Sequence, residues 1–217
     1  MNNSKAYNRL IKQLNASGIA RRDGYYPNTM EEIYDWERDE VEDVILDHFN
    51  NKNDVDLAIF LPKMKKYDVD LAIFLPKMKK YDGIKILEES PFLLRIPSEE
   101  SVEISTVLYA ATGNEKYLDI IKKNIDASPN NICYVTMLSY CKPCEKLYKM
   151  FKDIYINNKN KINRNSAVMG MLHYKGIVRD IRSIEESNAT IKLCEKFKTE
   201  RKRERKKILD KFENGQF

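Results

Sequence analysis

Four cysteines and two histidines are the side chains of this sequence that could ligate a metal or carry redox chemistry. Cys141 and Cys144 form a CxxC pair, a spacing found in zinc sites and in thioredoxin-like redox motifs. Zinc would need two further ligands at motif spacing, and Cys133, Cys194 and His173 do not provide it. A redox CxxC belongs beside a strand of a βαβ unit, which the sequence does not predict. We expect a turn between helices, with no metal and no cofactor.

The histidines, His48 and His173, lie on or beside predicted apolar helix faces. Acid–base catalysis would require a partner carboxylate in a shared cleft. The sequence also lacks the phosphate-binding and dinucleotide-binding glycine motifs, the GxSxG elbow and the HExxH zinc motif. We therefore expect structural histidines and a protein that is not an enzyme.

Charge is segregated along the chain, and this is the clearest functional signal. The segment Thr29–Asn50 has nine acidic residues and one arginine, a net charge of −8. The segment Lys192–Phe217 has ten basic and five acidic residues, a net charge of +5, and is densest at Arg201–Lys207. The overall charge of +5 thus conceals two oppositely charged surfaces.

Clustered acids repel one another, so the acidic segment is tolerated best when a basic partner, or the chain's own basic helix, faces it. Trp36, the only tryptophan, is either an exposed interface anchor or a core residue. For the basic run Arg201–Lys207, the lack of interleaved aromatic residues favours a solvated terminal helix over a nucleic-acid contact. The predicted partner-binding residues are Glu31, Glu32, Asp35, Trp36, Asp39, Glu40, Glu42 and Asp43.

Composition excludes several protein classes. The 217 residues are 42% apolar and 33% charged, and only 7 glycines and 7 prolines are present, too few for the turns of an all-β sandwich. No apolar run approaches the ~18 residues of a membrane span. The N-terminus lacks the apolar core of a secretory signal, and four cysteines without framework spacing suit a reducing compartment. We expect a cytoplasmic protein.

Apolar residues recur at helical spacing along most of the chain, between helix caps such as Ser98 and Gly113. Predicted hairpins start near Ser98, Ser128 and Lys161, 30 and 33 residues apart. This spacing predicts one all-α domain over residues 1–217, an α-solenoid of stacked hairpins of the HEAT or armadillo type. The alternative is an irregular α-helical bundle. Single long helices are expected from Thr29 to about Phe49 and over residues 189–213.

A segment of fourteen residues occurs twice in tandem without a difference: Asp54–Tyr67 and Asp68–Tyr81 both read DVDLAIFLPKMKKY. Such identity indicates a recent or engineered duplication. Fourteen residues turn a helix by nearly four full turns, so an inserted copy almost preserves the apolar face. We expect one copy to pack, with a helix capped by Asp56, although Leu57–Leu61 also suits a buried strand.

The stretch Trp36–Gly83, with one copy removed, reads WERDEVEDVILDHFNNKNDVDLAIFLPKMKKYDG. An acidic helix, a polar turn and a DLA…LP helix that ends in basic residues resemble the HEAT-like helical immunity proteins of bacterial toxin–immunity systems. The later segment VLYAATGNEKYLDIIKKNI is similar to a HEAT or ankyrin hairpin. The resemblance implies a small cytosolic protein that binds and blocks one cognate toxin, often a basic nuclease.

Overall fold

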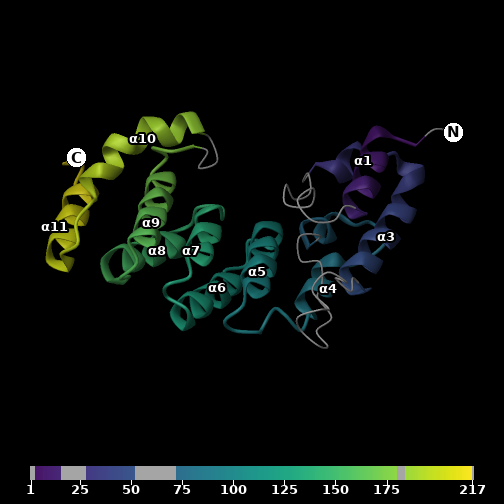
Figure 1. The fold of residues 1–217 in the computed structure, drawn as a ribbon, viewed down its shortest axis with the longest axis horizontal. Coiled ribbons are helices and arrows are strands. Elements are labelled where there is room, and N and C mark those ends of the chain that lie inside the picture. The colour runs from purple at the N-terminus through teal and green to yellow at the C-terminus, as the bar shows by residue number, and fades with distance from the viewer. Residues whose placement is uncertain (1–2, 16–27, 52–71, 180–183, 217) are drawn as a thin grey trace. The chain divides into compact units, whose positions relative to one another are not determined.

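The computed structural model describes residues 3–15, 28–51, 72–179 and 184–216. Across these residues the chain is helical and contains no β-strand (Figure 1), which confirms the predicted all-α class. In the same part of the chain, no helix combines the length and the apolar character needed to cross a membrane. The chain divides into two compact units, Met1–Leu93 and Leu94–Phe217, and the single repeat domain over 1–217 stays a prediction.

The first unit, Met1–Leu93, is built from short helices. They are α1 (Lys5–Leu14), α2 (Thr29–Glu32), the 3-10 turn η2 (Asp35–Glu37), α3 (Arg38–Asn51), the 3-10 turn η4 (Leu75–Lys77) and α4 (Gly83–Glu88). Helix α1 contacts α2, and α4 contacts η4. The core of this unit contains Leu10, Leu14, Met30, Val41, Ile45, Phe49, Ala72, Phe74, Leu75 and Leu87, all at most 2% exposed.

The prediction of one helix from Thr29 to about Phe49 is wrong. The backbone is extended at Ile33 and Tyr34, and α3 begins only at Arg38. The cause is Glu37, whose carboxylate accepts hydrogen bonds from the backbone N–H of Tyr34 at 3.1 Å and of Ser4 at 2.6 Å. A side chain that satisfies such free donors starts a new helix. The break turns Tyr34 and Trp36 out toward solvent.

The second unit, Leu94–Phe217, contains the remaining helices of the described chain. They are α5 (Glu99–Thr112), α6 (Lys116–Ala127), α7 (Ile132–Ser139), α8 (Glu145–Asn157), α9 (Lys161–Tyr174), α10 (Ile184–Lys196) and α11 (Lys202–Glu213). Two predicted caps are confirmed: the Ser98 hydroxyl accepts from the Ser101 N–H at 3.0 Å, and Gly113 ends α5 in the left-handed region at φ 68°. The second hairpin start is displaced, because Asn131 rather than Ser128 caps α7, and the third agrees with α9, which begins at Lys161.

Helices of the second unit pack pairwise. Helix α5 contacts α6 and α7, α7 contacts α9, and α8 contacts both α9 and α11. The single helix predicted over 189–213 is instead two helices, α10 and α11, because the guanidinium of Arg205 binds the backbone carbonyls of Thr199 and Glu200 between them. The regular stack that defines a solenoid stays a prediction.

The second copy of the duplicated segment, from Ala72 to Tyr81, packs in the first unit. Its Phe74 and Leu75 are fully buried, and Pro76 lies in the short turn η4 rather than in an α-helix. The backbone of Gly83 comes so close to Leu75 that an added Cβ would lie 1.7 Å from the Leu75 carbonyl oxygen. The first copy and its predicted cap Asp56 lie outside the described residues.

Deletion of Asp68–Tyr81 tests whether the fold requires both copies. Deleting Asp54–Tyr67 would give the same sequence, so the remaining copy keeps its junction with Asp82 and Gly83. We expect a folded protein with an equal or higher melting temperature, because a shorter chain then closes between α3 and η4. Circular dichroism melting curves measure this.

Deletion of both copies, residues 54–81, is the control. It removes the buried Phe74 and Leu75, each worth roughly 1.5–3 kcal/mol of burial, and should abolish cooperative melting of the first unit. Loss of cooperative melting already in the single deletion would contradict the prediction.

Candidate functional site

The predicted partner-binding residues do not form one continuous acidic helix face. They come from α2, η2 and α3, and they differ in exposure. The exposed ones are Glu31, Glu32, Asp35, Trp36, Asp39, Glu40 and Asp43, whereas Glu42 is fully buried.

Glu42 fastens the second copy to α3. One of its carboxylate oxygens accepts hydrogen bonds from the backbone N–H of Lys79 at 2.9 Å and from Arg38 Nε at 3.1 Å, and the other accepts from the backbone N–H of Lys80 at 2.8 Å. Arg38 in turn donates to the carbonyls of Met30, at 3.1 Å, and Lys77, at 2.7 Å. A buried and fully bonded carboxylate offers no surface to a partner, so Glu42 is a structural group rather than a contact residue.

Basic residues of the second copy lie over three exposed acids. Lys77 Nζ is 3.0 Å from Glu31 and Lys79 Nζ is 3.4 Å from Asp35, and both are exposed pairs. The third is Asp43, which Lys80 Nζ and the Tyr81 hydroxyl bind at 2.6 and 2.7 Å. One further acid, Glu32, pairs with Arg9 of α1 at 2.7 Å. Pairing of these acids with the basic run Arg201–Lys207, which belongs to the second unit, stays a prediction. Within the first unit, the bases that pair with them are Arg9 of α1 and Lys77, Lys79 and Lys80 of the second copy.

Hydrogen bonds favour the charged form of two carboxylates in this unit, those of Asp43 and Glu37. Hydrogen bonds from Lys80 and then Tyr81 lower the pKa of Asp43, and the bond to Asp43 raises the pKa of Lys80. Burial raises the pKa of Glu37, but hydrogen bonds from Ser4 and Tyr34 outweigh it, so its pKa lies below the ordinary value. These groups therefore contribute to the packing of α1, α3 and the second copy.

Two aromatic side chains remain open to solvent beside the acids. Tyr34 is 53% exposed and Trp36 51% exposed, and their ring centroids are 6.2 Å apart. The Asp35 side chain between them in sequence is 94% exposed. Asp39 is exposed on the following turn, and Glu40 accepts a hydrogen bond from the Tyr7 hydroxyl at 2.7 Å. Trp36 is thus outside the core, and Tyr34 is a surface residue that sequence reasoning missed.

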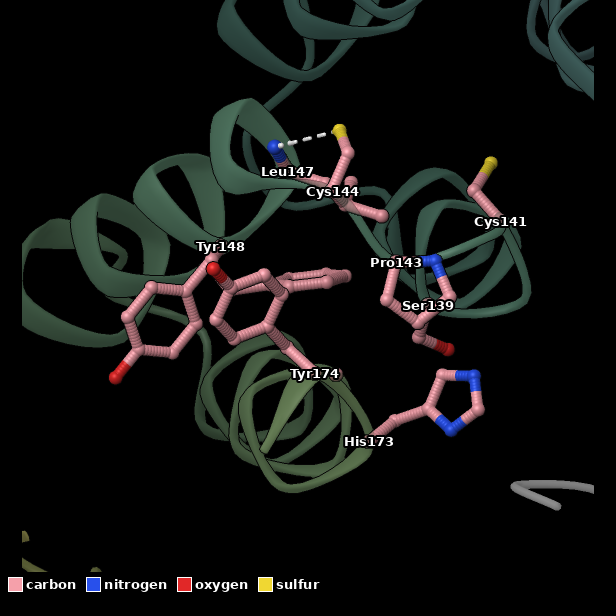
Figure 2. Close-up of a pocket in the computed structure, with 10 residues that line it drawn as sticks. Ser139, Cys141, Pro143, Cys144, Leu147, Tyr148, His173 and Tyr174 are labelled. Atoms are coloured by element: carbon pink, nitrogen blue, oxygen red, sulfur yellow. Dashed lines mark hydrogen bonds between the residues drawn. The ribbon is translucent and has the colours of Figure 1, made fainter. Parts of the chain in front are cut away.

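The cysteine and histidine cluster of the second unit is a packed helix junction (Figure 2). The Cys144 thiol caps α8 by accepting from the Leu147 N–H at 3.4 Å, and His173 Nδ1 lies 2.8 Å from the Val178 carbonyl oxygen. Burial raises the pKa of Cys141 to about 12, which leaves the thiol protonated and unreactive. In Figure 2 the thiols and the imidazole point in different directions.

The side chains around these cysteines fill the space between them and leave no room for a bound molecule. Across the part of the chain that the structure describes, no three potential cysteine, histidine or carboxylate ligands gather at one point. The junction is therefore a packed part of the fold.

Comparison of the chain with protein-family models, with curated proteins and with solved structures finds no match. The surface formed by Tyr34, Asp35, Trp36, Asp39 and Glu40, which we call the aromatic–acidic surface, is the best candidate for contact with a partner.

Replacing Glu42 by glutamine tests whether its carboxylate holds the second copy against α3. The amide presents a donor where the carboxylate accepted three hydrogen bonds, so buried donors of Arg38 or the Lys79–Lys80 backbone lose their acceptor. We expect the free energy of unfolding, measured in urea, to fall by about 2–4 kcal/mol. The matched control Asp39→Asn removes the same charge at an exposed position and should change it by less than about 0.5 kcal/mol. If the two substitutions lowered the free energy of unfolding equally, the Glu42 hydrogen bonds would not hold the second copy in place.

Acid should destabilise the protein partly through Asp43. The pKa of Asp43 in the folded state lies below the ordinary value of 3.8, so the stabilisation is complete above that value and is lost as pH falls through the folded pKa. We expect the melting temperature to fall below about pH 5 in the wild type and to fall less steeply in Asp43→Asn. Asp39→Asn again provides the control, and identical acid slopes in all three proteins would refute the assignment.

Proposed function

We propose that this protein is an inhibitor of the immunity type, which binds a basic toxin protein, most simply a nuclease, through the aromatic–acidic surface. The observation that supports the proposal is the pair Tyr34 and Trp36, both about half-exposed and flanked by carboxylates. Tryptophan and tyrosine dominate the binding energy of protein interfaces, and a large exposed pair has no role in the core.

Charge around this pair suits a basic partner. Asp35 and Asp39 are exposed, and the only contact of Asp35 described here is the long, solvent-exposed pair with Lys79. Exposed ion pairs of this kind contribute about 0–1 kcal/mol, so a lysine or arginine of a partner can replace Lys79 at little cost. Acids at the rim also speed association with a cation-rich surface and occupy a cleft that binds phosphate.

The proposal includes the finer architecture. Helices α5 to α9 would form stacked hairpins of the HEAT type, and the concave face of such a stack is the alternative binding surface. The contacts of α5 with α7 and of α7 with α9 are those that one layer of a stack requires. As an inhibitor of a toxin made in the same cell, the protein would act in the cytoplasm.

The test uses the protein encoded by the adjacent reading frame, produced with and without this chain. Charge reversal of Asp35 and Asp39 to lysine should weaken binding at least tenfold at low salt, remove most of the salt dependence, and reduce growth protection. Trp36→Ala should weaken binding by about 2 kcal/mol or more, measured by calorimetry. Asp43 is left intact, because it pairs with Lys80 and Tyr81 inside the fold.

Two matched variants separate the surfaces. Tyr140→Ala removes an exposed aromatic residue of the second unit and should leave affinity unchanged. Asp126→Lys, at an exposed position on α6, should change the affinity only as far as the change in net charge does. Unchanged affinity in the folded Asp35→Lys/Asp39→Lys and Trp36→Ala proteins would exclude the aromatic–acidic surface and leave the concave face.

A further inference from the structure

A basic pocket lies in the second unit, where the connection between α10 and α11 meets α8 and α9. It has a volume of about 150 Å³, roughly ten times the ~10–15 Å³ that admits one water molecule. Helix α9 contributes Lys161, Arg164 and Asn165, and the connection contributes Lys198 and Glu200. The pocket belongs to the second unit, whereas the aromatic–acidic surface belongs to the first.

One buried guanidinium group, that of Arg164, lines this pocket, and a second, that of Arg205, holds the connection that forms part of its lining. Arg164 is only 5% exposed, and it donates to the carbonyls of Asn158 at 3.3 Å and Lys159 at 2.8 Å and to the Glu200 carboxylate at 2.6 Å. Arg205, 6% exposed, donates to the backbone carbonyls of Ile156, Thr199 and Glu200. The connection is thus fixed in a defined shape by charged hydrogen bonds.

Positive charge exceeds negative charge in the pocket. Three bases line it, Lys161, Arg164 and Lys198, against one lining carboxylate, Glu200, and Lys198 also pairs with Glu195 outside the lining. The described hydrogen-bond acceptors of Arg205 are backbone carbonyl oxygens, and none of them is a carboxylate. The Glu200 side chain is 73% exposed and hence free to turn into solvent and release an Arg164 donor. Of the three lining bases only Arg164 is buried, whereas Lys161 and Lys198 are exposed, and a bound anion would accept hydrogen bonds from all three.

We propose that this pocket binds a phosphate group. Its donors are of three kinds: the ammonium groups of Lys161 and Lys198, the side-chain amide of Asn165, and the Arg164 guanidinium once Glu200 turns away. A phosphate oxyanion accepts several charge-assisted hydrogen bonds at once and matches a guanidinium in shape. The group belongs either to a small phosphorylated molecule or to the backbone of a nucleic acid, and the experiment separates these sources.

The experiment titrates the full chain with inorganic phosphate, with chloride at equal ionic strength as the reference. Phosphate should raise the melting temperature and shift the backbone amide NMR signals of Asn165 and Glu200 saturably. Lys161→Ala/Lys198→Ala should weaken the affinity about tenfold or more, whereas Lys206→Ala/Lys207→Ala, an equal loss of charge on the exposed face of α11, should have little effect.

Glu200→Gln provides the sharper test, because it removes the carboxylate that occupies Arg164. It should strengthen phosphate binding more than Asp210→Asn, which removes the same charge from an exposed site on α11. No saturable shift with phosphate, or equal effects of the paired variants, would overturn the proposal.

A single-stranded oligonucleotide identifies the source of the phosphate. Weaker oligonucleotide binding in Lys161→Ala/Lys198→Ala, alongside weaker phosphate binding, assigns the pocket to a nucleic-acid backbone. Phosphate binding without oligonucleotide binding assigns it to a small molecule. Oligonucleotide binding that depends only on Lys206 and Lys207 would overturn the pocket as its site.

Discussion

The first unit depends on one buried charge, the carboxylate of Glu42. Its three hydrogen bonds hold the backbone of the second copy against α3, and Arg38 ties the same copy to the end of α2. A segment without regular secondary structure has backbone N–H groups that need hydrogen-bond acceptors, and the Glu42 carboxylate accepts from two of these groups, those of Lys79 and Lys80. Burial of Phe74 and Leu75 and the pairing of Lys77, Lys79 and Lys80 with the surface acids follow from this attachment.

The second unit uses the opposite charge for the same task. Arg164 and Arg205 satisfy the carbonyls left free at the end of α8 and between α10 and α11. In both units, buried charge is therefore placed where helices are interrupted. The candidate sites lie at two of these interruptions. Tyr34 and Trp36 are exposed between α2 and α3, and the basic pocket adjoins the connection between α10 and α11.

Periodicity and caps were sufficient to predict most helices of the second unit, because residues such as Ser98 and Gly113 act through local geometry. The break at Ile33–Tyr34 was not predictable in this way. It depends on a hydrogen bond that the backbone N–H of Ser4, more than thirty residues away, donates to the Glu37 carboxylate. Counting acids marked an acidic segment, but it could not separate Glu42, buried by the second copy, from the exposed Asp35 or Asp39. Charge alone does not reveal burial, which long-range packing decides.

The close approach of Gly83 to Leu75 determines more than local packing. The two copies have the same sequence and therefore the same affinity for α3, so no residue inside them can distinguish one from the other. The residues that follow them differ: the position that Gly83 occupies after the second copy is Val69 after the first. A Cβ there would overlap the carbonyl of the docked leucine. Selection between two interchangeable segments is thus made by a neighbour outside both, and mutation of Gly83 would remove that discrimination without altering either segment.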